Sequence, residues 1–240
     1  MDYSIMIVCD RYLQRLNLVL RNWLAQDVAA DAYEILISSS LPDDGVRNYI
    51  KNLAIAYPQH PITLVENEPG RTKLEYQETL VAKARGHIFA LVDADMVFPT
   101  RFLSYVRDLA LEDGHCVWLG RAYLTREQTY RAILGNFDLL NPALFVRPLQ
   151  GEIANAVIYE KEPTGCCHVY TRQTFEGSGG YEGIEVWGGR YGGFASRLLR
   201  KMERLGTLKC YHKIEDFVAL HLWHGTDDGH ENWNGADIHW

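Results

Sequence analysis

The sequence predicts an α/β protein in which a mixed, mostly parallel sheet is flanked by helices. Short apolar runs alternate along the first half of the chain with segments whose apolar residues recur at helical spacing. Strands separated by helices of about 10–15 residues are typical of βαβ units. The 240 residues are 47% hydrophobic and 23% charged, which is ordinary for a globular protein.

The elements of the first half follow from these patterns in order. Apolar runs predict four strands, at 4–8, 34–38, 62–65 and 87–92. Helical spacing predicts three helices, at 13–24, 46–56 and 74–84. A fourth helix is marked by Phe102, Val106 and Leu109.

The second half is less regular. A strand at 116–119 precedes a predicted helix at 126–136 and an irregular stretch with three prolines. A strand at 169–171, a glycine-rich run, a helix that ends at Gly206 and an apolar run at 217–223 follow. We expect one domain, 1–240. Residues 1–113 would form a nucleotide-binding half, and 114–240 would complete the sheet, the acceptor site and the metal site.

Composition excludes several classes of protein. The net charge of -7 argues against nucleic-acid binding, which needs a basic surface. No apolar run approaches the ~20 residues of a transmembrane helix, and Asp2 stands where a signal peptide has a positive charge. We therefore expect a cytoplasmic protein. Five cysteines without a Cys-x-x-Cys motif predict reduced thiols rather than a zinc knuckle or a disulfide framework.

Two carboxylates, Asp93 and Asp95, follow the strand expected at 87–92. Ligands of open α/β sheets bind at the carboxyl ends of strands. The two carboxylates would repel each other there unless a cation lay between them and a substrate, so we expect Mn²⁺ or Mg²⁺ at this place, with Asp95 facing solvent. Such an ion would neutralise a departing nucleoside diphosphate. Alone, Asp-x-Asp is frequent by chance.

Two histidines, His221 and His224, end the last apolar run. A neutral imidazole can complete a manganese site that a carboxylate begins. Without the aspartates such a pair would more often be a surface or hydrogen-bonded core feature. With them, His224 is the candidate third ligand, and we expect it within ligand range of Asp95, with His221 as its reserve.

A glycine-rich stretch contains Gly179-Gly180-Tyr181-Glu182 and then Trp187-Gly188-Gly189. The glycines predict a backbone that bends near a ligand, and an indole between glycines suits stacking on a sugar ring. A glycine-rich surface loop with a core tryptophan is the plainer interpretation of this stretch on its own.

In order and spacing, these motifs resemble the nucleotide-sugar glycosyltransferases of the GT-A fold, in the broad family-2 group with β-1,4-galactosyltransferase-like features. The resemblance covers nearly the whole chain. It implies a metal site of Asp95, His224 and His221, and places Glu182, Glu185 and Asp93 in catalysis. It further implies acceptor binding by Gly180, Tyr181, Trp187, Gly188 and Arg190. For donor binding it implies Cys9, Asp10, Arg11, Ser38, Arg71 and Asp93.

One departure from the family's pattern bears on mechanism. Arg190-Tyr191 stands where the family has Glu-Asp, whose carboxylate is the catalytic base. Neither side chain is a ready proton acceptor at neutral pH. Glu182 is then the leading base, Glu185 its reserve, and Asp227 or Asp228 further candidates. Retention of configuration without a protein base, or loss of transfer activity, are the other two accounts.

The expected function is metal-dependent transfer of a hexosyl or N-acetylhexosaminyl group from a nucleotide-sugar donor to a saccharide or other hydroxyl acceptor, with inversion favoured over retention. A catalytically silent nucleotide-sugar or glycan-binding module is the alternative, and Arg190-Tyr191 favours it. A sugar-1-phosphate nucleotidyltransferase ranks third, because no glycine-rich phosphate loop follows the first strand.

Overall fold

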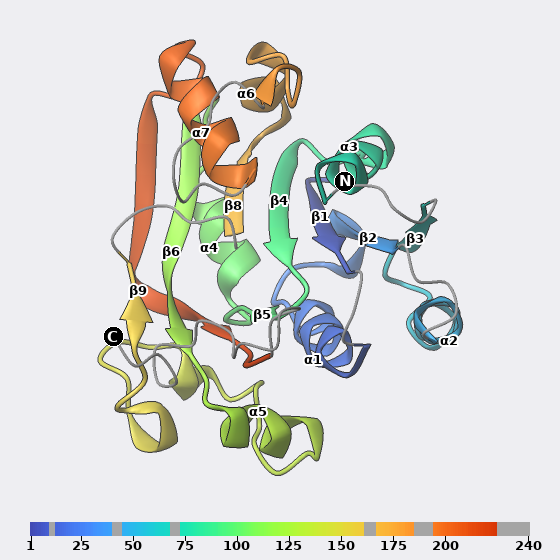
Figure 1. Cartoon of the computed structure of the whole chain (residues 1–240), viewed down its shortest axis with the longest axis vertical. Helices are drawn as coiled ribbons and strands as arrows, with labels where there is room; N and C mark the ends of the chain where they lie inside the picture. Colours follow the sequence, from blue (N-terminus) through green and yellow to red (C-terminus); the bar gives the residue numbers. More distant parts are fainter. Residues whose placement is uncertain (10–12, 40–44, 68–72, 161–166, 185–193, 225–240) are drawn as a thin grey trace.

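The computed structural model describes residues 1–9, 13–39, 45–67, 73–160, 167–184 and 194–224. Within them, one nine-stranded sheet runs through both halves of the chain, in the order β3-β2-β1-β4-β8-β6-β9-β5, with β7 paired to β6 (Figure 1). The expected α/β class with a mixed sheet and flanking helices is confirmed.

The first half forms the parallel part of the sheet. Strands β3, β2, β1 and β4 are parallel neighbours. The expected elements are all present, with ends within one or two residues of the prediction. They are β1 (Tyr3–Val8), α1 (Leu13–Leu24), β2 (Tyr33–Ser39), α2 (Val46–Ala56), β3 (Ile62–Glu66), α3 (Lys73–Lys83), β4 (Ile88–Asp93) and, after β4, α4 (Phe102–Asp108).

The second half adds antiparallel strands. β8 pairs antiparallel with both β4 and β6, whereas β6 and β9 are parallel. The elements are β5 (Met96–Val97), β6 (His115–Tyr123), α5 (Arg126–Ile133), β7 (Ile158–Tyr159), β8 (Cys167–Thr171), α6 (Arg172–Gly177), α7 (Phe194–Arg204) and β9 (Cys210–His221). Short 3-10 turns lie at Ala30–Ala32, Pro142–Leu144 and Gly151–Ile153.

Several elements differ from the prediction: β5 and β7, each of two residues, were not predicted, and β6 extends to Tyr123 rather than 119. α5 ends at Ile133 rather than 136, because the chain turns at Gly135 with a φ of 78°. α6 was not predicted; the hydroxyl of Thr171 caps its first turn by accepting from Thr174 N. β9 begins seven residues before the apolar run, since its first part is only half-buried and carries polar side chains.

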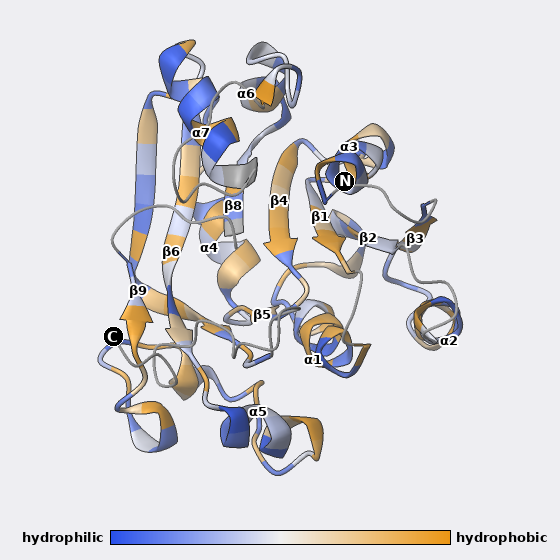
Figure 2. Cartoon of the chain, in the orientation of Figure 1, coloured by the Kyte–Doolittle hydropathy of each residue, from blue (hydrophilic) through white to orange (hydrophobic). Residues whose placement is uncertain are grey.

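Each face of the sheet carries its own core, because successive strand residues point to opposite faces. Ile5 and Ile7 of β1 belong to one core, with side chains from α1, α2, α4 and α5, whereas Met6 belongs to the other, with side chains from α3, α6 and α7. Figure 2 shows β1 and β4, in the middle of the sheet, as largely hydrophobic, whereas the first part of β9 is mostly hydrophilic. The helices therefore form a layer on each face.

The carboxyl ends of β1, β2, β3 and β4 lie at one edge of the sheet. Their register pairs Val8 with both Ser38 and Asp93, and Ser39 with Glu66. At this edge the chain continues from Asp93 into β5, which pairs with the far end of β9. Figure 1 shows β9 sweeping from the outer side of the sheet across to β5.

Candidate functional site

The pairing of β5 with β9 brings the late histidines to the aspartate motif. Met96 pairs with His221 in antiparallel register, and Leu222 N donates to Asp95 O at 2.8 Å. The segment after His221 therefore runs back past Asp95, where His224 reaches the carboxylate.

Asp95, His221 and His224 form a compact group of ligand atoms. His224 Nε2 lies 2.6 Å from Asp95 Oδ2, and His221 Nε2 lies 3.7 Å from the same oxygen. One ligand atom from each residue lies within 4.8 Å of the other two. The structure thus brings together all three residues that the sequence predicted as metal ligands.

Asp95 differs from the solvent-facing carboxylate that we expected. Its side chain is only 16% exposed, because the end of β9 packs over it. The second carboxylate oxygen, Oδ1, is buried and has no hydrogen-bond partner among the described residues. A buried carboxylate oxygen without a partner is costly, and a cation would satisfy it.

The protonation states of the group suit a cation. Burial lowers the pKa of His221 to about 4, although the charge of Asp95 opposes this shift. Burial alone would raise the pKa of Asp95. The interactions with His221 and His224 outweigh that effect and hold this pKa well below its usual value. At neutral pH the group therefore offers an ionised carboxylate and a neutral imidazole from His221, as a metal requires.

Contacts from three other elements anchor the segment 221–224. Leu124 N, just after β6, donates to His221 O at 3.0 Å. Trp223 N donates to Thr129 Oγ1 of α5 at 2.9 Å, and Arg15 Nε of α1 donates to Trp223 O at 2.6 Å. Sequence reasoning missed Arg15 and Thr129, because Arg15 lies 208 positions from Trp223 and neither belongs to a motif.

Asp93 is not one of the three clustered residues, and its carboxylate contacts a lysine. Lys73 Nζ, in the first turn of α3, lies 2.5 Å from Asp93 Oδ1. This ion pair offsets the repulsion that we expected between Asp93 and Asp95. Lys73 lies two residues after Arg71, which the resemblance implies as a donor-binding residue, but Lys73 itself was not predicted as a site residue. Arg71 lies outside the described residues.

The expected donor-binding residues of β1 and β2 have buried side chains. Cys9 is 1% exposed and belongs to the core, and its backbone N–H donates to Ser38 O at 2.8 Å. The hydroxyl of Ser38 is fully buried and accepts from Asn67. Their backbone lies at the carboxyl edge, but neither side chain is at the surface. Asp10 and Arg11 lie outside the described residues.

The expected acceptor loop follows α6. Tyr181 is 5% exposed and packs edge-on against Phe175 at 5.1 Å between ring centroids. Lys201 of α7 fixes the turn by donating to Gly180 O at 2.8 Å and to Glu182 O at 2.6 Å. The side chain of Glu182 is exposed.

This turn begins at the opposite end of β4 from the metal group. Thr171, just before α6, pairs with Ile88, the first residue of β4, whereas Asp93 is its last. The described residues therefore do not bring Glu182 to Asp95. Several predicted residues lie outside the described residues: Glu185, Trp187, Gly188, Arg190, Tyr191, Asp227 and Asp228.

Among the described residues, no helix has both the length and the hydropathy needed to cross a membrane.

Solved structures share this fold at low sequence identity. A mannosyltransferase from Pyrobaculum calidifontis, in complex with GDP-Man and Mn²⁺, is 18% identical with a TM-score of 0.58, and the match covers 92% of this chain and 56% of that one. GalNAc-T7, with UDP, GalNAc and Mn²⁺, is 11% identical with a TM-score of 0.63, covering 92% and 43%. This chain thus spans about half the length of these two proteins.

The fold is not confined to glycosyltransferases. A putative glucose-1-phosphate thymidylyltransferase from Bacillus anthracis is 11% identical with a TM-score of 0.52, and the match covers 90% of this chain and 88% of that one. Fold alone therefore does not separate sugar transfer from nucleotidyl transfer.

The sequence family makes that distinction. No match was found among curated proteins. Residues 4–175, from β1 into α6, match the family described as "Glycosyl transferase family 2". The matched region includes Asp93, Asp95 and Lys73, whereas His221 and His224 lie beyond it. The chain belongs to glycosyl transferase family 2.

Proposed function

We propose that this protein is a metal-dependent glycosyltransferase that moves a sugar from a nucleoside-diphosphate sugar to a hydroxyl acceptor. The observation that carries the proposal is the group of Asp95, His221 and His224 at the carboxyl edge of the sheet. Residues 1–113 would hold the donor, and 114–240 would hold the acceptor and complete the metal site.

The donor atoms of the group fit a divalent cation. Asp95 supplies a buried carboxylate whose Oδ1 has no other partner among the described residues, and the two histidines supply imidazole nitrogens. Imidazole suits Mn²⁺ better than Mg²⁺, which prefers oxygen ligands and keeps several waters. We therefore infer Mn²⁺ as the preferred ion. When bound, it would supply positive charge to the diphosphate of the leaving nucleotide.

Lys73 and Asp93 would position the donor beside this group. Their ion pair holds the lysine ammonium at the carboxyl edge, at the first turn of α3. A cation and a helix N-terminus both favour an anionic ligand nearby. Asp93, held in place by Lys73, would accept a hydrogen bond from a donor hydroxyl.

The proton of the acceptor hydroxyl needs a base if the transfer inverts configuration. We assign this role to a carboxylate of the loop after α6, with Glu182 first and Glu185 second. This choice rests on the sequence motif: the carboxylate of Glu182 is exposed, but its turn begins at the amino end of β4, away from Asp95. The β-1,4-galactosyltransferase-like features remain a prediction.

The second candidate is a silent binding module of the same fold, favoured by Arg190-Tyr191 in the place of Glu-Asp. One experiment separates the two functions. The protein would be incubated with a panel of nucleotide sugars, with Mn²⁺ or with a chelator, and release of nucleoside diphosphate would be measured. We expect release that requires Mn²⁺ and disappears in Asp95→Asn.

Asp108→Asn is the matched control, because Asp108 is an exposed carboxylate in α4. Binding that raises the melting temperature with Mn²⁺ and nucleotide sugar, without any release, would favour the silent module. Neither binding nor release across the panel would contradict both functions.

A further inference from the structure

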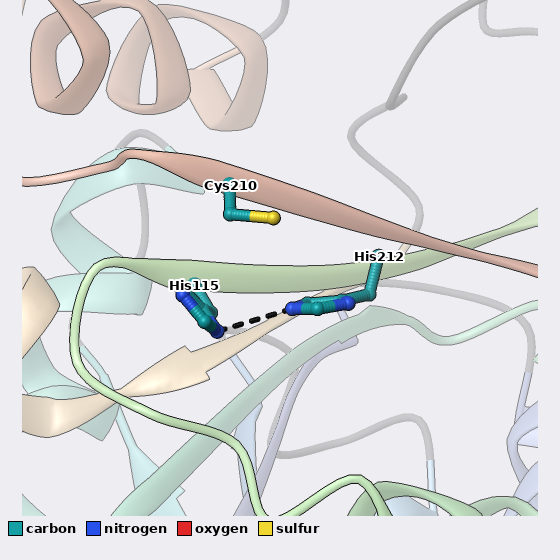
Figure 3. A group of neighbouring side chains, drawn as sticks. All are labelled: His115, Cys210 and His212. Carbon is teal, nitrogen blue, oxygen red and sulfur yellow. Dashed lines mark hydrogen bonds between the residues drawn. The ribbon is translucent and has the colours of Figure 1, made fainter.

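A second group of potential metal ligands lies at the start of β6 and β9, away from Asp95. His115, Cys210 and His212 each place one ligand atom within 4.8 Å of the other two (Figure 3). We propose that these three residues bind a Zn²⁺ ion that joins β6 to β9. The proposal does not depend on the glycosyltransferase activity.

The register of the two strands produces the group. His115 is the parallel partner of Cys210, and His212 lies two residues further along β9, opposite Val117. Side chains two apart on a strand point to the same face. Cys116, which follows His115 on β6, and Tyr211, which lies between Cys210 and His212 on β9, point to the other face. Both pack in the core on that face. All three ligand candidates therefore lie side by side on one face.

The turn before β6 holds the ends of the two strands together. Gly114 adopts a φ of 85°, a conformation that glycine reaches without strain. Its carbonyl accepts from Lys209 N at 2.7 Å and from Cys210 N at 3.2 Å. The backbone that carries the ligands is thus fixed before any ion binds.

The two imidazoles already face each other. His212 Nε2 lies 3.1 Å from His115 Nδ1, and the two rings share this contact as a hydrogen bond (Figure 3). Two nitrogens at this distance need one proton between them, and a metal ion can replace that proton. In a tetrahedral zinc site with Zn–N bonds of about 2.0–2.1 Å, two nitrogens lie about 3.3 Å apart. The existing spacing is close to that value.

The donor set selects the metal. Cys210 adds a sulfur to the two nitrogens, and it is not in a disulfide. Thiolate and imidazole ligands together suit Zn²⁺, whereas a soft thiolate is a poor ligand for Mg²⁺ and Mn²⁺. The group is distinct from that of Asp95, which contains no sulfur and includes His221, the last residue of β9.

Access and coordination number fit a bound ion. His115, Cys210 and His212 are all half-buried, so an ion can enter without unfolding the strands. Three protein ligands leave the fourth tetrahedral position to water. Because the ion would bind the folded state and bridge two strands, it would raise the stability of the protein by mass action.

Cobalt provides a direct test, because Co²⁺ occupies zinc sites and a thiolate ligand gives it an intense ultraviolet charge-transfer band. The full chain, stripped with a chelator under reducing conditions, would be titrated with Co²⁺. We expect a saturable thiolate band that Zn²⁺ removes by displacement. The band should disappear in Cys210→Ser and weaken at least tenfold in apparent affinity in His212→Gln.

Three controls separate this site from other metal binding. Asp95→Asn should keep the band, which would place it outside the Asp95 group. Cys116→Ala, which removes a thiol on the other face, and His87→Gln, which removes an exposed histidine, should also keep it. The absence of a thiolate band in the wild type, or its survival in Cys210→Ser, would overturn the proposal.

A measurement on the wild type guards against variants that fail to fold. Alkylation of Cys210 would be followed by peptide mass spectrometry with and without Zn²⁺. We expect Zn²⁺ to slow modification of Cys210 at least tenfold and to leave that of the buried Cys9 unchanged. Equal alkylation rates at Cys210 with and without Zn²⁺ would contradict a site that includes this sulfur.

Discussion

His224 Nε2 lies 2.6 Å from Asp95 Oδ2, and this contact follows from the antiparallel pairing of β9 with β5. The pairing fixes His221 opposite Met96 and directs the next three residues back along Asp95. The pairing thereby adds two imidazoles to Asp95, one carboxylate of a motif that is common by chance, and the resulting group is largely shielded from solvent. The bent path of β9 is what makes the site.

Removing His224 should weaken metal binding without unfolding the protein. His224→Ala takes away one of three ligands, and the residue lies at the end of the described segment, outside both cores. We expect at least a tenfold loss of Mn²⁺ affinity by calorimetry in the presence of a nucleoside diphosphate. His87→Gln is the control at an exposed histidine, and equal loss in both variants would contradict the assignment.

The hydrogen bond between Trp223 and Thr129 should position the histidines. Thr129→Val leaves the buried Trp223 N–H without its acceptor, which typically costs about 1–3 kcal/mol. We expect both the free energy of unfolding and the Mn²⁺ affinity to fall. Thr129→Ser keeps the hydroxyl and should retain most of both. If Thr129→Val lost stability but kept full Mn²⁺ affinity, the residue would be structural only.

Most of the first half could be predicted from sequence because its signals are local. Each expected helix and strand there has its own apolar spacing, and α2 even has the predicted bounds. α6 escaped prediction because it is short and ends where the glycine-rich run begins. The early part of β9 escaped because a half-buried strand with polar residues carries no continuous apolar run.

The site could be predicted only in part. Asp95 and the two histidines were found because each motif suggested metal chemistry, but their contact depends on a pairing between distant strands. Lys73, Arg15 and Thr129 carry no such signal, since a lysine, an arginine or a threonine in a helix is usually solvated or structural. The cluster of His115, Cys210 and His212 was missed because it depends on the pairing of two distant strands: His115 and His212 are 97 positions apart.

A buried histidine in β8 should make the protein less stable in acid. Burial lowers the pKa of His168 to about 3, and its Nε2 has no hydrogen-bond partner among the described residues. In the unfolded chain this pKa would be about 6.5. Between the two values the unfolded state binds the extra proton, so stability falls as the pH decreases below about 6.5, by up to about 1.4 kcal/mol per pH unit.

Replacing this histidine should reduce that dependence. His168→Leu removes the titrating group and fills the same buried position between β4 and β6 with an apolar side chain. Urea unfolding at pH 7 and at pH 5 would measure the difference in the free energy of unfolding. We expect a smaller difference in His168→Leu than in the wild type or in His87→Gln. An unchanged difference would mean that other groups cause the acid sensitivity.

The catalytic base is tested by removing carboxylates from the loop after α6. Glu182→Gln keeps the size of the side chain and cannot alter the hydrogen bonds that Lys201 makes, because these go to backbone carbonyls. If Glu182 takes the proton of the acceptor hydroxyl, turnover should fall by about 10²–10⁴ with donor affinity nearly unchanged. Glu176→Gln, at an exposed carboxylate of α6, is the matched control and should turn over at the wild-type rate.

Because α6 begins at the amino end of β4, the parallel variant Glu185→Gln decides whether the base lies further along the loop. Wild-type turnover in both Glu182→Gln and Glu185→Gln would exclude a base from this loop, and NMR analysis of the product anomer would then distinguish retention from a base supplied by Asp227 or Asp228.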